Sequence, residues 1–513
     1  MSAVKKHHLL RIIITLLAVS TYSNNLHAEW GTNSRNDPFK VFSAIWPHYF
    51  LYQREKQLMF GYADEKGTPE RVMVGISAFG QNATNAKTLA GTYCKPQGFV
   101  NTTCPGECNT IACSNPSPTN CPDPVCSNEI NIGDIDGRWN LLGLLAGPLP
   151  QGASFPPLLL DALNTLFPGA QPGSITSSMI EVSAEPSCRP LFGYVSVPLK
   201  YRKRGVRWDI EAIICGDFGL QFEGGVVEIS QVLNPCFINL SGTPGASSNL
   251  CQTNDNINPD KINCLLFNQL VPLLNQLGLD VCNFTKWGVE DMYLSLYWRH
   301  AHVVNFNRDL SWARLLAIPF IRIGGGIATG HTKDPSRQFS LPFGNNGSNS
   351  FNANIGIDFD FVETIEVGGE IGYSHFFSKN FDNYRLPTNV LQSGIFPFAT
   401  SVNVKPGDTI YLAGKMHAYH FIDRLSFWFQ WVYVHHRKDT ITRLIDDPAF
   451  IQIDHNNPLS KCPNTVWRAQ LGNFGFYYDV SPNLQFGFLW QQMFHARNVY
   501  NATTCMFTVN FIF

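Results

Sequence analysis

Charge is scarce in this sequence, and beyond the N-terminal segment it has no long apolar run. Asp, Glu, Lys and Arg make up 15% of the 513 residues, and the formal net charge is −2. Such a near-neutral chain argues against a protein that binds nucleic acid through a basic surface. Without a long apolar run, the mature chain has no segment suited to a transmembrane helix. Aromatic residues, in contrast, reach 13%, with 38 phenylalanines.

Catalytic and ligand motifs are also missing. No Gly-x-Ser-x-Gly motif occurs, and no set of Ser, His and acid can be assigned from spacing. The stretch 325–332 departs from a phosphate-binding loop because His331 replaces the lysine that must reach the phosphates, so we interpret it as the start of a flexible loop. Four histidines look like a ligand cluster: His417, His420, His435 and His436. The hairpin register around 422–424 spreads them over the height of a sheet, so we expect no metal, no cofactor and no enzyme.

The N-terminus has the pattern of a secretory signal. Basic residues precede a short apolar run at 12–19, and Ala28 closes a cleavage site. The run is too short to span a bilayer as a helix, and an ordinary N-terminal helix is the alternative. We expect residues 1–28 to be a signal peptide and residues 29–513 to form a single exported domain.

Cysteine is abundant and unevenly placed. There are 14 cysteines, and 12 of them fall between Cys94 and Cys282. Six lie in one stretch rich in Pro, Asn, Thr and Gly: Cys94, Cys104, Cys108, Cys113, Cys121 and Cys126. In an exported chain this pattern indicates disulfides, here among the six themselves. A zinc site is the alternative, although no CxxC pair occurs and no histidine lies between Cys94 and Cys126.

Apolar and polar residues alternate in many segments, and this alternation predicts strands. We expect strands at 39–48, 54–63, 71–81, 192–201, 206–216, 290–305, 312–324, 351–361, 365–376, 409–421, 425–436, 467–479, 484–494 and 505–513. Short turns fall at one end of these strands: 64–70, 202–205, 306–311, 362–364, 422–424 and 481–483. Connections of roughly 25 to 30 residues fall at the other end: 325–350, 377–408 and 437–466. The pattern predicts an all-β fold, a closed antiparallel transmembrane β-barrel of about 14 strands, with a range of 12–16.

Two connections are far longer than the rest. Residues 82–191 carry the six-cysteine stretch, and residues 223–289 carry further cysteines. Each holds leucines at helical spacing, at 158–166 and 265–277, so we expect short helices in these two extracellular insertions. Loops of this size are usually functional. Three alternatives stay open: each helix packs on its own disulfide-bonded loop, plugs or gates the lumen, or offers a face to a partner.

The chain ends on TTCMFTVNFIF, where large apolar residues alternate with others up to the last residue. The alternating apolar positions are Phe507, Val509, Phe511 and Phe513. This ending resembles the insertion signature of Gram-negative outer-membrane β-barrel proteins of the porin type. The cysteine content is only loosely similar to that of the cysteine-rich major outer-membrane porins of chlamydia-type bacteria.

The resemblance implies a place in the bacterial outer membrane, contact with its lipid, and insertion of the C-terminal strand by the barrel-assembly machinery. It implies passive diffusion of small solutes or ions through a porin or channel, and it leaves a homo-oligomer open. The alternative is a structural or adhesive surface protein with disulfide-stapled extracellular loops and no transport. The terminal strand is covered in a closed barrel because it pairs with the first strand.

The charged residues of the predicted strands share one face. If the more apolar face points outward, eleven side chains line the interior: Arg207, Asp209, Glu211, Arg299, Asp358, Asp360, Glu366, Glu370, Lys415, His417 and Arg468. In a water-filled pore such charges set ion preference. The excess of carboxylates over Lys and Arg in this set predicts weak cation selectivity. A structural salt-bridge network across the lumen is the competing interpretation.

The last two cysteines, Cys462 and Cys505, have no other cysteine near them in the sequence. Both are expected at the outer end of the barrel, on strands that one hairpin separates. The flexible segment before Trp467 can bridge that gap, so we expect a disulfide between them.

Overall fold

The structure, a computed structural model, divides into two compact units, residues 1–34 and 35–513. The residues that it describes all lie in the second unit: 72–87, 93–95, 125–127, 129–131, 194–196, 199–215, 217–233, 236–238, 280, 282–305, 314–334, 336–337, 340–361, 365–385, 399–422, 424–445, 466–481, 483–497 and 499–513, with isolated residues at 157, 160, 272, 275 and 276. In this described part, no helix is long and apolar enough to cross a membrane. Several predictions lie outside it: the signal peptide, the strands 39–48 and 54–63, the turn 64–70 and most of the segments 158–166 and 265–277.

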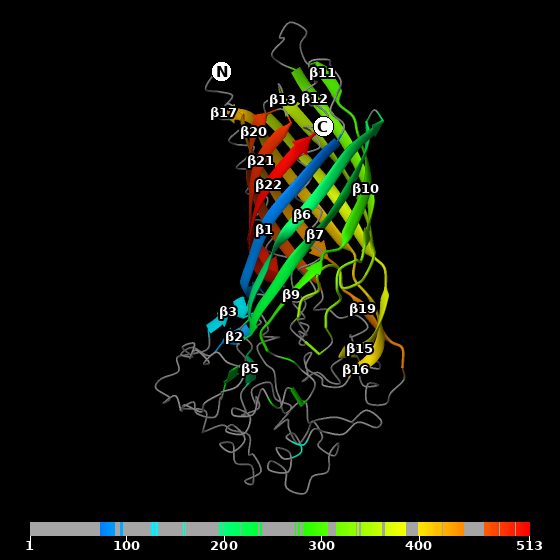
Figure 1. Cartoon of the computed structure of the whole chain (residues 1–513), viewed down its shortest axis with the longest axis vertical. Helices are drawn as coiled ribbons and strands as arrows, with labels where there is room; N and C mark the ends of the chain where they lie inside the picture. Colours follow the sequence, from blue (N-terminus) through cyan, green and yellow to red (C-terminus); the bar gives the residue numbers. More distant parts are fainter. Residues whose placement is uncertain are drawn as a thin grey trace. The chain divides into compact units, whose positions relative to one another are not determined.

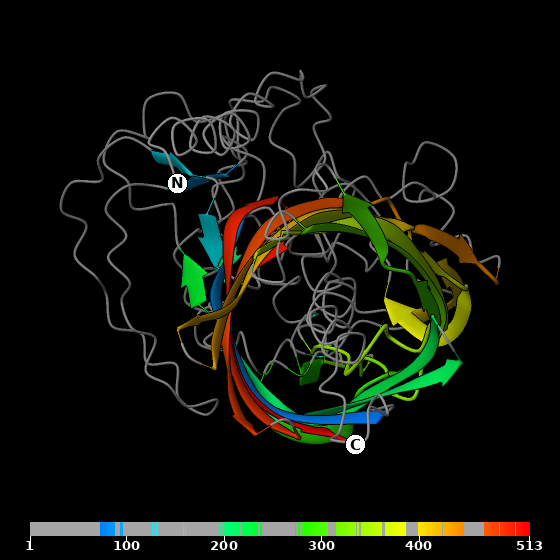
Figure 2. The same cartoon turned by 90° about the horizontal axis from the view of Figure 1, so that it is seen from above.

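The described strands close into an antiparallel barrel with twelve wall positions. The wall is built from β1 (Val72–Lys87), β6 (Leu199–Cys215), β7 (Phe218–Leu233), β9 (Phe284–Val289), β10 (Met292–Arg299), β11 (His302–Asn305), β12 (Arg314–Ile327), β13 (Ser350–Phe361), β14 (Ile365–Phe376), β17 (Thr409–Ile422), β18 (Leu425–His436), β20 (Trp467–Ser481), β21 (Leu484–Arg497) and β22 (Val499–Ile512). β9, β10 and β11 follow one another as pieces of a single wall position, because β9 and β10 both pair with β7 and β11 pairs with β12. The ring is complete since β22 pairs with β1 and β10 pairs with β12, as Figure 2 shows along the barrel axis.

Side chains of the wall strands alternate between the outside and the inside of the barrel, and charged side chains gather mainly on the inside. On β13, Ile355, Ile357 and Phe359 are exposed on the outside, while Asp358 and Asp360 between them are buried inside. The outward aromatics also contact one another across strands, for example Phe476–Phe488 and Phe486–Phe507, whose ring centroids lie 5.4 and 6.0 Å apart. The outer face is therefore suited to lipid, and the polar groups turn inward.

The two ends of the barrel differ, as the sequence predicts. Short connections gather at the end where the C-terminus lies: 216–217, 306–313, 362–364, 423–424 and 482–483. The long connections gather at the other end, which we call the loop end (Figure 1), although residue 498 alone joins β21 to β22 there, where the predicted strands 484–494 and 505–513 leave a longer connection. There β15 (Lys379–Arg385), β16 (Ala399–Lys405) and β19 (Thr440–Arg443) form a three-stranded sheet, β2 (Tyr93–Lys95) pairs with β3 (Val125–Ser127), β4 (Glu129–Asn131) pairs with β1, and β5 (Tyr194–Ser196) pairs with β8 (Cys236–Ile238).

The predicted turn at 202–205 is wrong. Residues 199–215 form one continuous strand, β6, and its partner β7 occupies 218–233, so that residues 223–233 of the predicted insertion 223–289 belong to the wall. The run of basic residues looked like a turn, but Lys203 turns inward to an ion pair and Arg204 turns outward to Glu228, so both fit a strand. Gly205 packs tightly there, because a Cβ would lie 2.2 Å from the carbonyl oxygen of Val226.

The terminal strand is covered by the first described strand of the barrel. Phe513 N donates to Val72 O at 2.8 Å, and Val72 N donates to Phe513 O at 3.1 Å. Phe507, Phe511 and Phe513 are exposed on the outer face. The final alternation is therefore an outward apolar stripe on a paired strand, as predicted.

The expected position of Cys505 is wrong. Cys505 lies opposite Trp490 and Gly80 within the wall, on the outward face, rather than at the outer end of the barrel. It carries a free thiol. The expected partner, Cys462, lies outside the described residues. The geometric premise of a Cys462–Cys505 disulfide therefore fails, and we do not retain that pairing.

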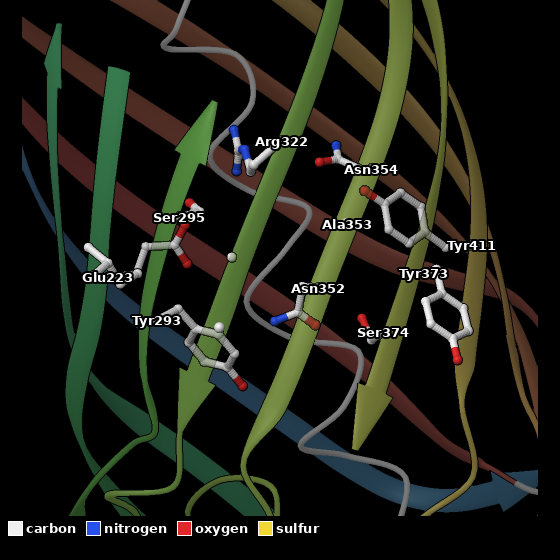
Figure 3. A pocket seen from close by; sticks show the side chains of 13 residues that line it. Glu223, Tyr293, Ser295, Arg322, Asn352, Ala353, Asn354, Tyr373, Ser374 and Tyr411 are labelled. Carbon is white, nitrogen blue, oxygen red and sulfur yellow. The ribbon is translucent and has the colours of Figure 1, made fainter. Parts of the chain in front are cut away.

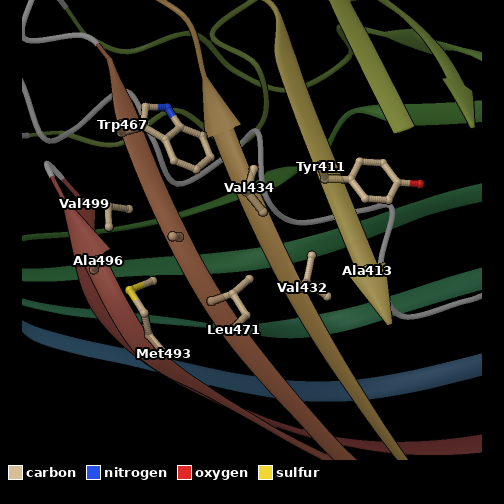
Figure 4. Packing of buried hydrophobic residues seen from close by; sticks show 10 residues of the cluster. Tyr411, Ala413, Val432, Val434, Trp467, Leu471, Met493, Ala496 and Val499 are labelled. Atoms are coloured by element: carbon tan, nitrogen blue, oxygen red, sulfur yellow. The ribbon is translucent and has the colours of Figure 1, made fainter. Parts of the chain in front are cut away.

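Apolar side chains line part of the interior near the loop end (Figure 4). They come from five strands in succession and are all buried: Tyr411, Ala413, Val432, Val434, Trp467, Ala469, Leu471, Met493, Ala496 and Val499. Beyond this cluster, towards the C-terminal end, the same strands turn polar side chains inward.

Candidate functional site

The interior of the barrel has two different walls. From β18 round to β1 the inward polar residues of the middle are mostly uncharged, and they bond to one another between strands. Asn473 Nδ2 donates to Gln430 Oε1 at 3.0 Å, and Asn510 Nδ2 donates to Gln485 Oε1 at 2.8 Å. Each of these bonds gives one polar atom of a buried amide a partner on the neighbouring strand.

The wall from β6 round to β17 is charged. Nine buried carboxylates face inward: Asp209, Glu211, Glu223, Glu290, Asp291, Asp358, Asp360, Glu366 and Glu370. Five cations share this wall: Lys203, Arg207, Arg299, Arg322 and Lys415. Carboxylates therefore outnumber Lys and Arg on the described inner face of these strands.

A ladder of ion pairs crosses this wall in the half near the C-terminal end. Arg299 Nη2 lies 3.3 Å from Asp358 Oδ2, and Lys415 Nζ lies 2.9 Å from the same oxygen. Lys415 also lies 3.7 Å from Glu366. Asp358 and Lys415 meet across the strand between them because Gly368 has no side chain; a Cβ there would lie 1.9 Å from Asp358 Oδ1. The glycine is thus required by the ion pair.

A β-bulge between β9 and β10 turns two successive carboxylates into the lumen. Val226 of β7 pairs with Val289, and Glu223 of β7 pairs with Tyr293. An advance of three residues along β7 therefore corresponds to an advance of four residues along its partner. One extra residue on a strand re-aims the side chains at that point. Glu290 and Asp291 are both buried there, although successive strand residues normally face opposite ways.

Glu290 holds two cations of β6. Arg207 Nε and Nη2 donate to its two oxygens at 2.6 and 2.7 Å, and Lys203 Nζ lies 2.5 Å from Oε1. These contacts pass over Gly225 of β7, where a Cβ would lie 2.8 Å from the glutamate oxygen. The guanidinium also covers the ring of Phe79 at 4.2 Å. The bulge, the glycine and the two cations form one bracket across three strands.

Asp291 anchors the connection 328–349 to the wall. Its carboxylate accepts hydrogen bonds from Gly330 N at 2.9 Å and from Asn345 N at 2.5 Å. Gly344 leaves room for this, because a Cβ there would lie 2.1 Å from the carboxylate carbon. Asn345 Nδ2 also donates to the inward Tyr293 hydroxyl at 2.9 Å. Two distant points of the loop are thereby held to one side chain.

The anchored segment turns back into the barrel. Leu341 and Phe343 are buried, and the ring of Phe343 lies against Gly288 on the inner face of β9. A second anchor holds the segment nearer the loop end, where Arg337 Nη2 lies 2.7 Å from Asp280. Figure 2 shows the light-green trace of this segment inside the ring. We call residues 328–349 the inner loop; it narrows the lumen beside the charged wall.

A polar hollow lies in the wall next to the inner loop (Figure 3). Its inward lining combines one carboxylate, one guanidinium, amides, hydroxyls and aromatic rings: Glu223, Tyr293, Ser295, Arg322, Asn352, Asn354, Ser374 and Tyr411. Gly324 and Gly325 of β12 lie in it and leave the wall thin between these side chains. The hollow offers both signs of charge and neutral hydrogen-bonding groups to a passing solute.

Ten of the eleven side chains predicted to line the interior do so: Arg207, Asp209, Glu211, Arg299, Asp358, Asp360, Glu366, Glu370, Lys415 and His417. Arg468 is wrong, because its neighbours Trp467 and Ala469 are the buried residues and the arginine is exposed outside. Of the predicted histidine group, His417 and His436 are buried inside, whereas His435 lies opposite Arg468 on the outer face.

On the charged wall, the sequence-based set omits five charged residues that face inward: Lys203, Glu223, Glu290, Asp291 and Arg322. The first two were assigned to a turn and to an insertion. The bulge hides the pair at 290–291, since it breaks the alternation on which face assignment depends. Of the five, Arg322 is the one that the sequence could have indicated, because it continues the even-numbered inner face of β12.

A closed barrel with an apolar outer face and a charged interior is the architecture of porin-like outer-membrane β-barrel proteins, which confirms the resemblance drawn from the sequence. No family model and no curated protein matches the chain. Solved structures that match include an outer membrane channel from Pseudomonas putida F1, with 7% identity, 87% of this chain and 97% of that chain covered, and a TM-score of 0.39. The toluene transporter TbuX of Ralstonia pickettii has 10% identity, coverage of 89% and 93%, and a TM-score of 0.27. The NanC porin has 9% identity, coverage of 60% and 93%, and a TM-score of 0.27. At these values the likenesses transfer no function.

Proposed function

We propose that this protein is a channel of the bacterial outer membrane for passive diffusion of small solutes or ions, with residues 1–28 as its export signal. One observation supports the channel above all others: a lipid-suited outer face encloses an interior that carries both carboxylates and cations. Charges at this density are costly in a dry core and inexpensive in a water-filled one. The inner loop then acts as the constriction.

We further propose that the channel is weakly cation-selective. Support comes from the nine inward carboxylates against five cations on the charged wall. In a confined pore an excess of carboxylate raises the local cation concentration, and salt screens this over about 10 Å at 0.1 M. The preference should therefore fade as ionic strength rises.

A structural or adhesive surface protein without transport is the second candidate. One observation favours it: Arg299, Asp358 and Lys415 are almost fully buried and joined in a ladder, as in a filled interior. Such a ladder ties the wall strands together and needs no permeating ion. The two proposals differ in whether a continuous water path passes the ladder and the inner loop.

Planar-bilayer recording on refolded full-length protein separates them. A channel gives discrete conductance steps, and a KCl gradient gives a reversal potential of the sign for cations. The double variant Glu223→Gln, Glu370→Gln should move the permeability ratio towards unity. Asp382→Asn is the matched control, since this carboxylate lies exposed on β15, outside the barrel wall. Absence of conductance steps in correctly folded protein would favour the structural role, and anion preference unaffected by the double variant would refute cation selectivity.

A further inference from the structure

Three basic side chains form a row on the outside of the barrel at its loop end. His435 of β18 lies opposite Arg468 of β20, and Arg468 lies opposite Arg497 of β21. Their sequence neighbours Trp467 and Ala496 are buried on the inner side. The row therefore faces outward, where the membrane would lie.

The row has no acidic counterpart in the described part of the chain. Arg468 Nε donates to His435 Nδ1 at 3.2 Å, so the histidine ring accepts at that nitrogen and carries its proton on Nε2, which is a further donor. Neither arginine makes an ion pair with a described carboxylate. The carboxylates of the adjoining connections, Asp408 and Asp439, bind histidines on other faces instead.

Two arginines directly opposite each other are an unfavourable pair for a sheet. Residues that face each other across antiparallel strands have Cβ atoms about 4.5–5.5 Å apart, and like charges at that spacing destabilise the pairing. An anion between the two guanidinium groups removes this repulsion and can take paired hydrogen bonds from each. A phosphate group has the charge and the oxygen atoms for that arrangement.

The surface beside the row indicates what carries the phosphate. Towards the middle of the wall, β20 and β21 present the exposed aromatic rings of Phe474, Trp490 and Phe494, which contact one another at centroid distances of 5.5 and 6.3 Å. The row thus lies where an apolar belt ends, at the depth of lipid headgroups. We propose that Arg468, Arg497 and His435 bind the phosphate of an anionic lipid headgroup in the leaflet at the loop end, an inference that depends on the proposed membrane location.

Binding of short-chain phosphatidic acid to the full chain in zwitterionic micelles, followed by native mass spectrometry, tests the site. The double variant Arg468→Gln, Arg497→Gln should bind about thirtyfold more weakly, from roughly fivefold for each arginine at a membrane surface. Arg204→Gln is the matched control: Arg204 also faces outward, on β6 within the wall, but it already gives two hydrogen bonds to Glu228. Its affinity should change less than about twofold.

Thermal unfolding of the same proteins gives a second readout, because the order of the two unfolding temperatures should reverse when phosphatidic acid is added. In micelles without phosphatidic acid the double variant should unfold at the same temperature as the wild type or higher, because the repulsion is gone. With phosphatidic acid the wild type should be the more stable protein. Unchanged lipid affinity in the double variant would overturn the site. Equal stabilisation by inorganic phosphate at the same concentration would overturn the assignment to lipid.

Conductance in phosphatidylcholine bilayers keeps this outcome apart from the channel proposal. The double variant should conduct like the wild type, since the row lies outside the lumen. If the wild-type protein bound phosphatidic acid no better than the double variant but conducted normally, only the lipid site would be refuted. Strong lipid binding without any conductance would refute only the channel.

Discussion

Asp291 should control the width of the lumen, because it is the side chain that holds the inner loop to the wall. Its carboxylate accepts two backbone N–H groups, from Gly330 and Asn345. Hydrogen bonds to a charged group contribute about 1.5–3 kcal/mol each. Asp291→Ala removes both, so the docked loop should lose roughly 3–6 kcal/mol relative to the undocked loop. Since about 1.4 kcal/mol is a factor of ten, the ratio of undocked to docked loop should rise by about two to four orders of magnitude.

Single-channel recording measures this directly. The wild type should show one dominant low conductance, and Asp291→Ala should spend much of its time at a higher level with visible transitions. Gly344→Ala should act in the same way, because its Cβ would lie 2.1 Å from the carboxylate carbon and displace the anchor. The hydrogen bonds from Asn345 to Tyr293 and from Thr329 to Glu290 stay in place, so the loop should fluctuate rather than leave.

Asp334→Ala is the matched control for this prediction. Asp334 lies in the same loop and also accepts two hydrogen bonds, but both come from Ser336 within the loop, at 2.9 and 2.7 Å. Its loss should leave the conductance level unchanged. If Asp291→Ala gave the same level and the same dwell times as the wild type and Asp334→Ala, the inner loop would not be the constriction.

Three further predictions concern assembly and stability. Deleting Phe513 should lower the membrane level of folded, heat-modifiable barrel severalfold, by immunoblot of unheated samples; normal levels would refute its role as the insertion signal. The backbones of Cys94 and Cys126 lie directly opposite in β2–β3, within the Cα spacing of a disulfide, so non-reducing peptide mapping should recover them linked rather than as free thiols. Arg299→Met should cost about 3–5 kcal/mol in urea unfolding, because it leaves the buried Asp358 with fewer partners; a loss below about 1 kcal/mol would mean that water already screens the ladder.

Much of the wall could be predicted because alternation is a local property. Wherever a strand keeps its period of two, as from Asp358 to Phe361 or from Lys415 to His417, the face of every side chain follows from one decision about the apolar side. The predicted turn at 362–364 matches the connection between β13 and β14, and the predicted turn at 481–483 overlaps the connection 482–483, since each interrupts the alternation of its flanking strands. Closure followed from the same pattern, because an unpaired terminal strand of this kind would be an exposed edge.

The errors occur where local pattern and tertiary contacts disagree. Residues 202–205 are polar enough for a turn, and only the positions of Glu290 and Glu228 across the wall make them a strand. Charge alone predicts an inward Arg468, yet the barrel also carries cations outside at its rim. The bulge at 290–291 leaves no local signature at all, since it is defined by the partner strand.

The glycines of the wall show why residue type alone could not reveal which charged side chains pair inside the barrel. Arg207 reaches Glu290 only over Gly225, and Lys415 reaches Asp358 only over Gly368, so each ion pair joins strands that are not neighbours. Lys203 and Arg207 gather on one carboxylate, and Arg299 and Lys415 gather on another. Four of the five cations are thereby concentrated at two sites, the bracket at Glu290 and the ladder at Asp358. Carboxylates continue along the rest of the charged wall. A sequence-based count of inward charges gives the sign of the net charge on the lumen wall. The bracket and the ladder decide where along the lumen a cation is attracted and where it is repelled. Replacing one of these glycines, as in Gly225→Ala or Gly368→Ala, should therefore break the ion pair that passes over it. The electrostatic potential along the lumen should then change, while the net charge of the lumen stays the same.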